Sequence, residues 1–358
     1  MTRHSSTRLI TEGRATLRLA LPLIAGQVSQ MLVGLADTLM IGRLGVVPLA
    51  AATFANTVLH LPLMFGIGMT MAISIRVSQA RGAGDPQRAR EALRNGLFLG
   101  LVVGGLTVGA AALLLPFFGD FGQEAAVTHA AADYFLIVAV SMIPAIGSMA
   151  VKNHADAMEH PWPAFWIMLG GVALNVLMNW ILIWGRLGAP ELGLEGAGVA
   201  TLIARAGTLA ALIAWSRWSP HIREWVPRHW FRPPCRDSLR SLIKVGLPAS
   251  LQLLAEVSAF VFATILIGTM GKEALASHQV AISCAATVFM VPLGLSMALT
   301  VRVGEAWGAG ARDRLRPIVV SGWLMAVAFT VFSAGSVLAF HGNIAGWFLT
   351  DPGARSVA

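Results

Sequence analysis

Charged side chains are scarce in this sequence. Only 12% of its 358 residues are Asp, Glu, Lys or Arg, about half the share found in soluble domains, while 56% are hydrophobic. The two cysteines, Cys235 and Cys284, lack metal-ligand spacing. Paired Asp-rich motifs, which an intramembrane prenyltransferase needs to hold Mg²⁺ and diphosphate, are also missing. We therefore expect neither a soluble domain nor an enzyme, and no cofactor.

Long apolar runs make up most of the chain instead. About 20 apolar residues span a bilayer as a helix, whereas barrel strands are about half as long and alternate in polarity. Nine stretches are long enough for a helix and do not alternate: roughly 19–41, 48–75, 95–118, 134–151, 163–184, 197–215, 241–270, 274–301 and 317–340. The sequence predicts an all-α polytopic membrane protein.

The chain also repeats itself at an offset of 226 residues. Identical pairs in register include Leu21/Leu247, Pro22/Pro248, Gly42/Gly268, Gly45/Gly271, Arg76/Arg302 and Gly82/Gly308. Matching glycines, prolines and arginines at one offset indicate a duplication, because these residues mark turns, kinks and membrane boundaries. Six helices precede the second copy, so both copies cross the membrane with the same polarity, as a parallel repeat.

The duplication predicts the domain organisation. We expect an N-lobe of six transmembrane helices at 1–216, a basic cytoplasmic linker at 217–240, and the first three helices of a C-lobe at 241–358. The partners of helices four to six would fall at about 360–441. We therefore expect a C-terminally truncated chain.

The distribution of basic residues predicts the orientation. In alternate loops, 21 of the 26 Lys and Arg, including Lys152, fall on the same side as the N-terminus; four fall on the other side, and Arg205 lies within a span. By the positive-inside rule the N-terminus is cytoplasmic. The net charge of +8 is thus a topology signal, and no nucleic-acid partner is expected.

The linker has an unusual composition. It contains four prolines, three tryptophans and six arginines. Tryptophan and arginine suit the headgroup layer, and proline prevents another span, so an interfacial segment is expected. The alternative is a connector that only tethers the lobes.

Two acids within the spans, Asp37 and Glu256, are the strongest functional candidates. An acid at the bilayer centre costs about 2.5 kcal/mol or more, so it persists where it binds a cation, a proton or an internal partner. Pairing of one of them with Arg205 is the structural alternative. They are not repeat mates, because Asp37 corresponds to Ala263 and Glu256 to Gln30.

Polar amides provide further candidates. Asn175 and Asn179 are four residues apart and share one helix face, which could face Asp37 and offer oxygens to an ion or hydrogen bonds to a protonated acid. Asparagines that only join helices are the alternative. Gln279 is a weaker candidate for substrate contact.

Several stretches resemble the multidrug and toxic compound extrusion (MATE) transporters, in their NorM-like branch. They are Leu21-Pro22 through Asp37-Thr38-Leu39-Met40-Ile41-Gly42-Arg43-Leu44-Gly45, Gln79-Ala80-Arg81-Gly82-Ala83-Gly84, Leu174 to Gly185, Gly188 to Thr201, Glu256 and His278-Gln279-Val280-Ala281. The resemblance implies a bundle of twelve helices in two lobes around a V-shaped cavity. It also matches Asp37 to the family's helix-one acid, Asn175 and Asn179 to its helix-five polar pair, and Glu256 to the helix-seven acid. The family's helix-ten acid would fall beyond Ala358.

The resemblance predicts an antiporter that exports small organic cations or amphiphilic compounds in exchange for Na⁺ or H⁺. The coupling ion, a proton or Na⁺, would bind at Asp37, Asn175, Asn179 or Glu256, and the substrate at Asp37, Glu256 and Gln279. The resemblance also implies a monomer in a bacterial inner membrane, in contact with membrane lipid. Two alternatives stay open: a flippase for lipid-linked precursors, for which only Arg205 offers a cation within the spans, and an inactive remnant.

Overall fold

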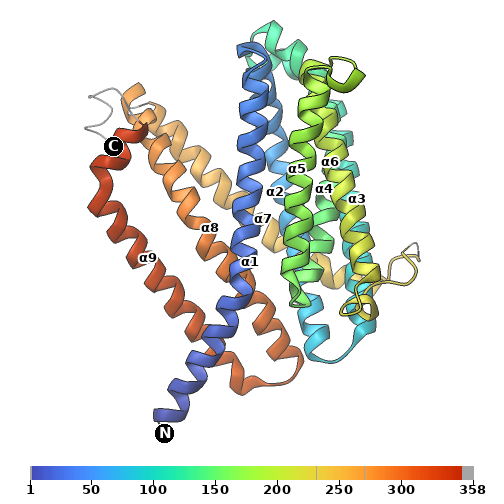
Figure 1. Ribbon diagram of the computed structural model, residues 1–358, viewed down its shortest axis with the longest axis vertical. Helices are drawn as coiled ribbons and strands as arrows, with labels where there is room; N and C mark the ends of the chain where they lie inside the picture. Colours follow the sequence, from blue (N-terminus) through green and yellow to red (C-terminus); the bar gives the residue numbers. More distant parts are fainter. Residues whose placement is uncertain (1, 231, 270, 349–358) are drawn as a thin grey trace.

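The computed structural model describes residues 2–230, 232–269 and 271–348, and nearly all of them are helical (Figure 1). Within these ranges there are nine long helices and no strand. The helices are α1 (Thr2–Gly42), α2 (Val46–Gly82), α3 (Pro86–Leu114), α4 (Ala125–Ala157), α5 (Pro161–Ile183), α6 (Gly193–Trp218), α7 (Arg236–Gly268), α8 (Lys272–Gly308) and α9 (Arg312–Phe348). Short 3₁₀ turns occur at Leu115–Phe121, Arg186–Gly188 and Arg223–Trp225.

All nine helices are long and apolar enough to cross a membrane. Helical segments suit the bilayer because every backbone N–H and C=O is satisfied within the segment. The helices extend past the apolar runs from which they were predicted: α4, expected over 134–151, runs from Ala125 to Ala157. The polar residues at these ends continue the helical hydrogen bonding outside the apolar stretch. The predicted all-helical membrane fold is confirmed.

The duplication is visible in the helix boundaries. α2 and α8 have the same length, and the ends of α8 are those of α2 shifted by 226 residues. Gly45 and Gly271, which precede these helices, both have a φ of 120°, a conformation open to glycine and costly for other residues. The repeated glycines are thus required by the turn that starts the second helix of each copy.

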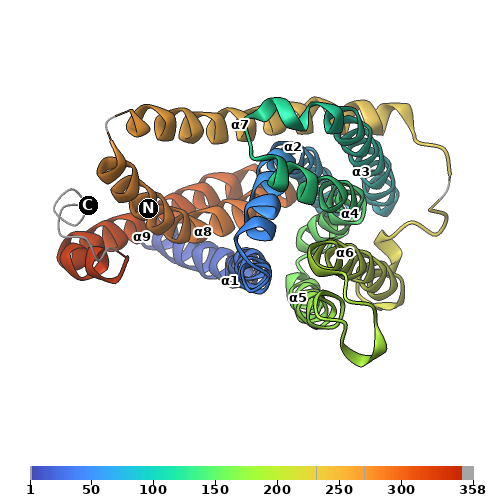
Figure 2. The same ribbon diagram turned by 90° about the horizontal axis from the view of Figure 1, so that it is seen from above.

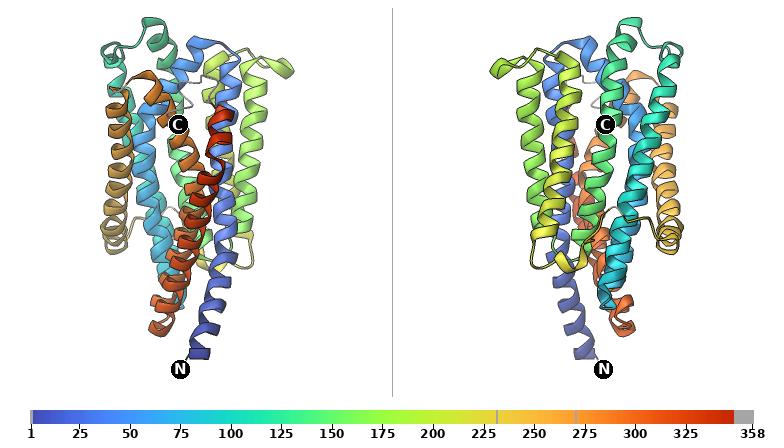
Figure 3. Two further views of the ribbon diagram at one scale, coloured as in Figure 1. Left: turned by 90° about the vertical axis from the view of Figure 1, so that its left-hand side faces the viewer. Right: turned by 90° about the vertical axis from the view of Figure 1, so that its right-hand side faces the viewer.

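The helices form two groups that meet at one end. We refer to α1–α6 as the N-lobe and to α7–α9 as the C-lobe; the helices of the C-lobe lean away from the N-lobe toward the end opposite the N-terminus (Figure 1). The start of α1 projects past the other helices (Figure 3). Between the lobes, α1 packs on α8 and α9, and α2 packs on α7 and α8. We call the end at which α1 begins the closed end, and the opposite one the open end.

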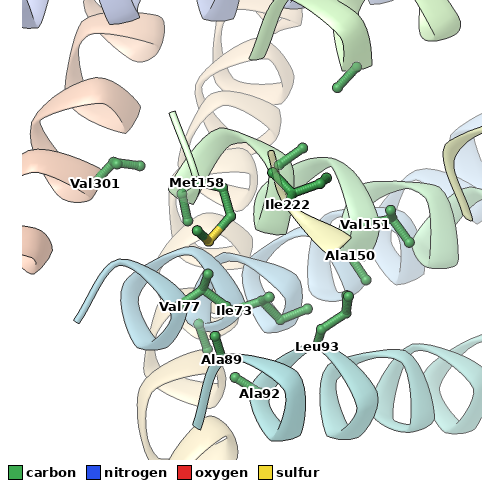
Figure 4. Packing of buried hydrophobic residues seen from close by; sticks show 14 of the residues in the cluster. Ile73, Val77, Ala89, Ala92, Leu93, Ala150, Val151, Met158, Ile222 and Val301 are labelled. Atoms are coloured by element: carbon green, nitrogen blue, oxygen red, sulfur yellow. The ribbon is translucent and has the colours of Figure 1, made fainter. Parts of the chain in front are cut away.

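The buried core explains this divergence. One apolar cluster at the closed end joins the lobes, since it combines Ile73 of α2 and Leu93 of α3 with Ile222 of the linker and Val301 of α8 (Figure 4). The second cluster, which includes Phe118 and Phe135, contains only residues of the N-lobe. Among the described residues, the apolar cluster that the lobes share is therefore the one nearer the closed end.

Glycines allow the closest approach of the lobes. A Cβ added at Gly82 of α2 would lie 2.0 Å from the carbonyl oxygen of Glu305 in α8, and one at Gly308 of α8 would lie 2.0 Å from the carbonyl oxygen of Gln79 in α2. Any side chain at either glycine would force the helices apart. Gly82 and Gly308 are repeat mates, as are Gln79 and Glu305, so the contact is made twice in symmetric form.

Candidate functional site

Asp37 and the two asparagines meet between α1 and α5. Asp37 lies near the open end of α1, which packs on α5. Asn179 Nδ2 donates a hydrogen bond of 2.7 Å to Asp37 Oδ1 and one of 3.3 Å to Asn175 Oδ1. Both asparagines are buried. The structure thus brings together three of the residues that the sequence singled out, and their role as a cation site stays a prediction.

Hydroxyl groups from neighbouring helices complete this cluster. Asn175 Nδ2 donates to Thr201 Oγ1 of α6 at 3.4 Å. The Tyr134 hydroxyl of α4 accepts from Asn56 Nδ2 of α2 at 3.3 Å and lies within electrostatic range of Asp37. Sequence reasoning missed both hydroxyls. Tyr134, the sole tyrosine of the chain, lies within an apolar run, which was the one available signal.

Arg205 is the cation of this region. Its Nη1 donates to Ser141 Oγ at 2.7 Å, and the guanidinium lies within electrostatic range of Asp37. No ion pair within 4.0 Å joins Arg205 to Asp37 in the described part of the chain. The structural alternative for Asp37, a direct pair with Arg205, is therefore not what the structure contains.

One acceptor in the cluster is unsatisfied. Asn179 Oδ1 is shielded from solvent and has no hydrogen-bond partner among the described residues. A buried acceptor without a partner is costly. This amide oxygen therefore favours a ligand that donates a hydrogen bond to it or a cation that it can coordinate. The cluster offers carboxylate, amide and hydroxyl oxygens, the ligands of hard cations. The described residues contain no group of three or more His, Cys, Asp or Glu that could hold a metal ion.

Glu256 and Gln279 lie elsewhere, in the C-lobe. Glu256 is exposed on α7, past the stretch around Ser250 that contacts the N-lobe. Gln279 is exposed on α8. Neither side chain has a recorded hydrogen bond or ion pair with the described residues around Asp37. The structure does not bring these two candidates into the N-lobe cluster, and their roles stay predictions.

At the closed end, ion pairs join the lobes. Glu12 of α1 accepts hydrogen bonds from Arg302 of α8 and, at 2.9 Å, from Arg314 of α9. Arg302 Nη1 also donates to Thr16 Oγ1 at 2.9 Å. Arg302 is only 5% exposed, so the Glu12 carboxylate is needed to stabilise its buried positive charge. Sequence reasoning assigned these charges to topology alone.

A second set of ion pairs lies beside the first. Arg81 of α2 pairs with Glu159 in the α4–α5 connection at 3.0 Å and with Glu305 of α8 at 3.9 Å. Burial alone would raise the pKa of Glu159, but the hydrogen bond and charge of Arg81 outweigh it and hold the pKa below its usual range. Glu159 is therefore a carboxylate at neutral pH.

A further ion pair is buried within the N-lobe. Lys152 Nζ lies 2.5 Å from Asp156 Oδ2, one helical turn away, and both side chains are about 5% exposed. The assignment of Lys152 to a loop was therefore wrong, because α4 continues to Ala157. Both charges are accommodated inside the bundle because each neutralises the other.

Comparison with known proteins identifies the family. The family model MatE matches residues 22–181 and 248–358. The "Probable multidrug resistance protein NorM" of Bradyrhizobium diazoefficiens is 40% identical over 298 residues, which cover 82% of this chain and 63% of that protein. A protein with the same description from Rhizobium meliloti is 32% identical over 339 residues, covering 95% and 73%. The matched part of the chain thus spans less than two thirds of the first relative, 63%, and 73% of the second.

Solved structures share the fold. A MOP superfamily transporter from Pyrococcus furiosus matches with a TM-score of 0.84 at 22% identity, over 97% of this chain and 76% of that one. An outward-facing MATE family transporter matches with a TM-score of 0.83 at 23% identity, over 97% and 76%. The family model and the relatives in sequence show that this chain belongs to the MATE transporter family, in its NorM-like branch.

Proposed function

We propose that this protein is a secondary antiporter that exports small organic cations or amphiphilic compounds in exchange for Na⁺ or H⁺. The observation that carries the proposal is the hydrogen bond of 2.7 Å between Asp37 and Asn179, whose own amide oxygen has no partner among the described residues. The relatives described as probable multidrug resistance proteins support the substrate class.

The Asn179 amide suits a change of protonation at Asp37. A carboxamide carries donors on nitrogen and an acceptor on oxygen. When Asp37 is ionised, Asn179 Nδ2 donates to it. When Asp37 is protonated, rotation of the amide by about 180° presents Asn179 Oδ1 to the new O–H donor. For Na⁺, the same rotation adds an amide oxygen to the Asp37 carboxylate as a second ligand.

Coupling follows from charge. An ionised Asp37 attracts an organic cation, whereas a proton or Na⁺ neutralises it and weakens that attraction. Arg205 lies within electrostatic range, so the site changes between near neutrality and net positive charge as the ion binds. If the two facing states of the transporter bind the ion with different affinity, ion binding shifts their populations.

The remaining candidates belong to the same proposal. Glu256 would be a second ion or substrate carboxylate in the C-lobe, and Gln279 a substrate contact; both are exposed and hence accessible. Asn175 would hold Asn179 in place through their hydrogen bond of 3.3 Å. We further infer an inner-membrane monomer surrounded by lipid, with the closed end in the cytoplasm.

The test is Asp37→Asn, which keeps the shape of the side chain but removes its charge and its titration. We expect coupled efflux of a cationic dye from membrane vesicles to fall to background, with normal insertion into the membrane. The matched control is Asp120→Asn, which removes an exposed acid and should leave efflux unchanged. Efflux by Asp37→Asn at the rate of the parent protein, driven by a Na⁺ or pH gradient, would refute the proposal. Glu256→Gln examines the C-lobe role in the same assay.

A further inference from the structure

The linker between the lobes is fixed to the bundle at several points. Ile222 is fully buried in the closed-end core. His154 Nε2 of α4 donates to the carbonyl of Trp225 at 3.0 Å. Near the start of α7, Asn95 of α3 makes hydrogen bonds with both the N–H and the C=O of Cys235. The linker runs around the outside of the bundle from α6 to α7 (Figure 2) and is a fixed element, not a free tether.

This fixed linker forms a basic cavity. The cavity has a volume of about 390 Å³ and is lined by Arg217, Arg228, His229, Trp230 and Arg232. None of the lining side chains is an acid. The three arginines are exposed, and no ion pair joins any of them to a described carboxylate.

The three arginines lack the carboxylate partners that some arginines at the closed end have. Arg81, Arg302 and Arg314 each have a carboxylate partner. Three guanidinium groups around one concavity repel one another, and no described carboxylate pairs with them. A multivalent oxyanion would reduce this repulsion, because the planar fork of arginine pairs with phosphate oxygens through two hydrogen bonds.

The indole of Trp230 also lines the cavity. Trp230 Nε1 is shielded from solvent and has no hydrogen-bond partner among the described residues. An indole N–H can only donate, so the missing partner is an acceptor. Solvent does not reach this atom, so the groups that an oxygen-rich anion in the cavity would contact are the three arginines.

The position of the cavity selects the source of that anion. α6 and α7, which flank the linker, are both candidate membrane spans. Trp218, at the end of α6, is 77% exposed, as suits an aromatic side chain at the level of the headgroups. We propose that the linker cavity binds the phosphodiester headgroup of an anionic membrane phospholipid. This site is independent of the antiport proposed above.

The experiment compares two triple variants of equal charge. The site variant is Arg217→Gln, Arg228→Gln and Arg232→Gln. The control variant changes three exposed arginines that do not line the cavity, one in the linker and two in the first turns of α7: Arg223→Gln, Arg236→Gln and Arg240→Gln. Each purified protein, in a neutral detergent, is titrated with phosphatidylglycerol or phosphatidylcholine, and bound lipid is counted by native mass spectrometry. Gel filtration and circular dichroism confirm that both variants are folded.

Phosphatidylglycerol should bind the parent protein more tightly than phosphatidylcholine does. The site variant should lose affinity for phosphatidylglycerol on the order of 100-fold, since each basic side chain near an anionic group contributes about a factor of five. The control variant should change by less than about threefold, because neutral micelles lack an extended anionic surface. Equal losses in the two variants would overturn the site, as would equal binding of the two lipids. Displacement of phosphatidylglycerol by equimolar inorganic phosphate would assign the cavity to a soluble anion and overturn the proposal.

Discussion

Replacement of Glu12 by glutamine should weaken the contact that holds the closed end together. Glu12 is the carboxylate partner of both Arg302 and Arg314, which belong to the other lobe. The substitution keeps the size of the side chain and removes its charge. Arg302 then keeps only neutral acceptors, the Thr16 hydroxyl and the backbone carbonyl of residue 12.

The structure sets the size of the effect. Removal of one partner from a buried ion pair costs about 3–5 kcal/mol, because the other charge stays buried and unpaired. Arg302 meets this condition at 5% exposure, whereas Arg314, with a side chain 43% exposed, contributes little. The neutral acceptors of Arg302 place the cost at the lower end, about 3 kcal/mol. This corresponds to a factor of about 150 in the equilibrium between joined and separated lobes.

The assay is a distance measurement between the lobes at the open end. Leu39 of α1 and Ile265 of α7 are both exposed and suit spin labels on introduced cysteines, with Cys235 and Cys284 changed to serine. Pulsed electron paramagnetic resonance on the parent should give one dominant distance. With Glu12→Gln, loss of the closed-end contact should allow the open ends to approach and add a population at shorter distance.

The control removes a similar but exposed pair. Arg8 and Asp313 also join α1 to α9, at 3.6 Å, with side chains 68% and 67% exposed. Such pairs contribute about 0–1 kcal/mol, so Asp313→Asn should leave the distances unchanged. Identical distance distributions for Glu12→Gln and the parent protein would show that the ion pairs at Arg302 do not hold the lobes together.

Two further predictions concern stability. Lys152→Met should lower the free energy of unfolding by about 3–5 kcal/mol, because Asp156 is left buried and unpaired. The double variant Lys152→Met/Asp156→Leu should recover most of the loss, because it removes both charges. Equal thermal stability of the single and double variants would contradict this. Glu159→Gln should lower Tm at pH 7, and its difference from the parent protein should shrink as the pH falls below about 4.5. A carboxyl with a lowered folded-state pKa stabilises the fold above its unfolded-state value and loses that contribution as the pH falls through the folded-state pKa. A Tm difference that stays constant between pH 7 and pH 3.5 would refute the role of the Arg81–Glu159 pair.

The fold was largely predictable because membrane spans follow from local hydrophobicity. The ends of the helices were not. The apolar run of α4 stops near residue 151, yet the helix continues through Lys152 and Asp156 to Ala157. These residues are polar, but they pair one turn apart and can be buried within the helix. A search for apolar runs cannot distinguish such a pair from the start of a loop.

The site was predictable only where its residues share one helix. The spacing of four placed Asn175 and Asn179 on one face, and the scarcity of acids within spans singled out Asp37. Thr201 and Tyr134 come from helices whose packing depends on the whole bundle, so no local pattern indicated them. Similarly, loop arginines that set topology have the same sequence pattern as arginines that join lobes.

The paired glycines at the closed end relate the two copies of the repeat by symmetry. Gly82 approaches the carbonyl of Glu305 as Gly308 approaches that of Gln79, so the surface of one copy is complementary to itself. A contact of this kind is isologous, the type made by two identical subunits around a two-fold axis. The two copies of the repeat thus pack on one another at the closed end as two identical subunits would, although one chain contains both.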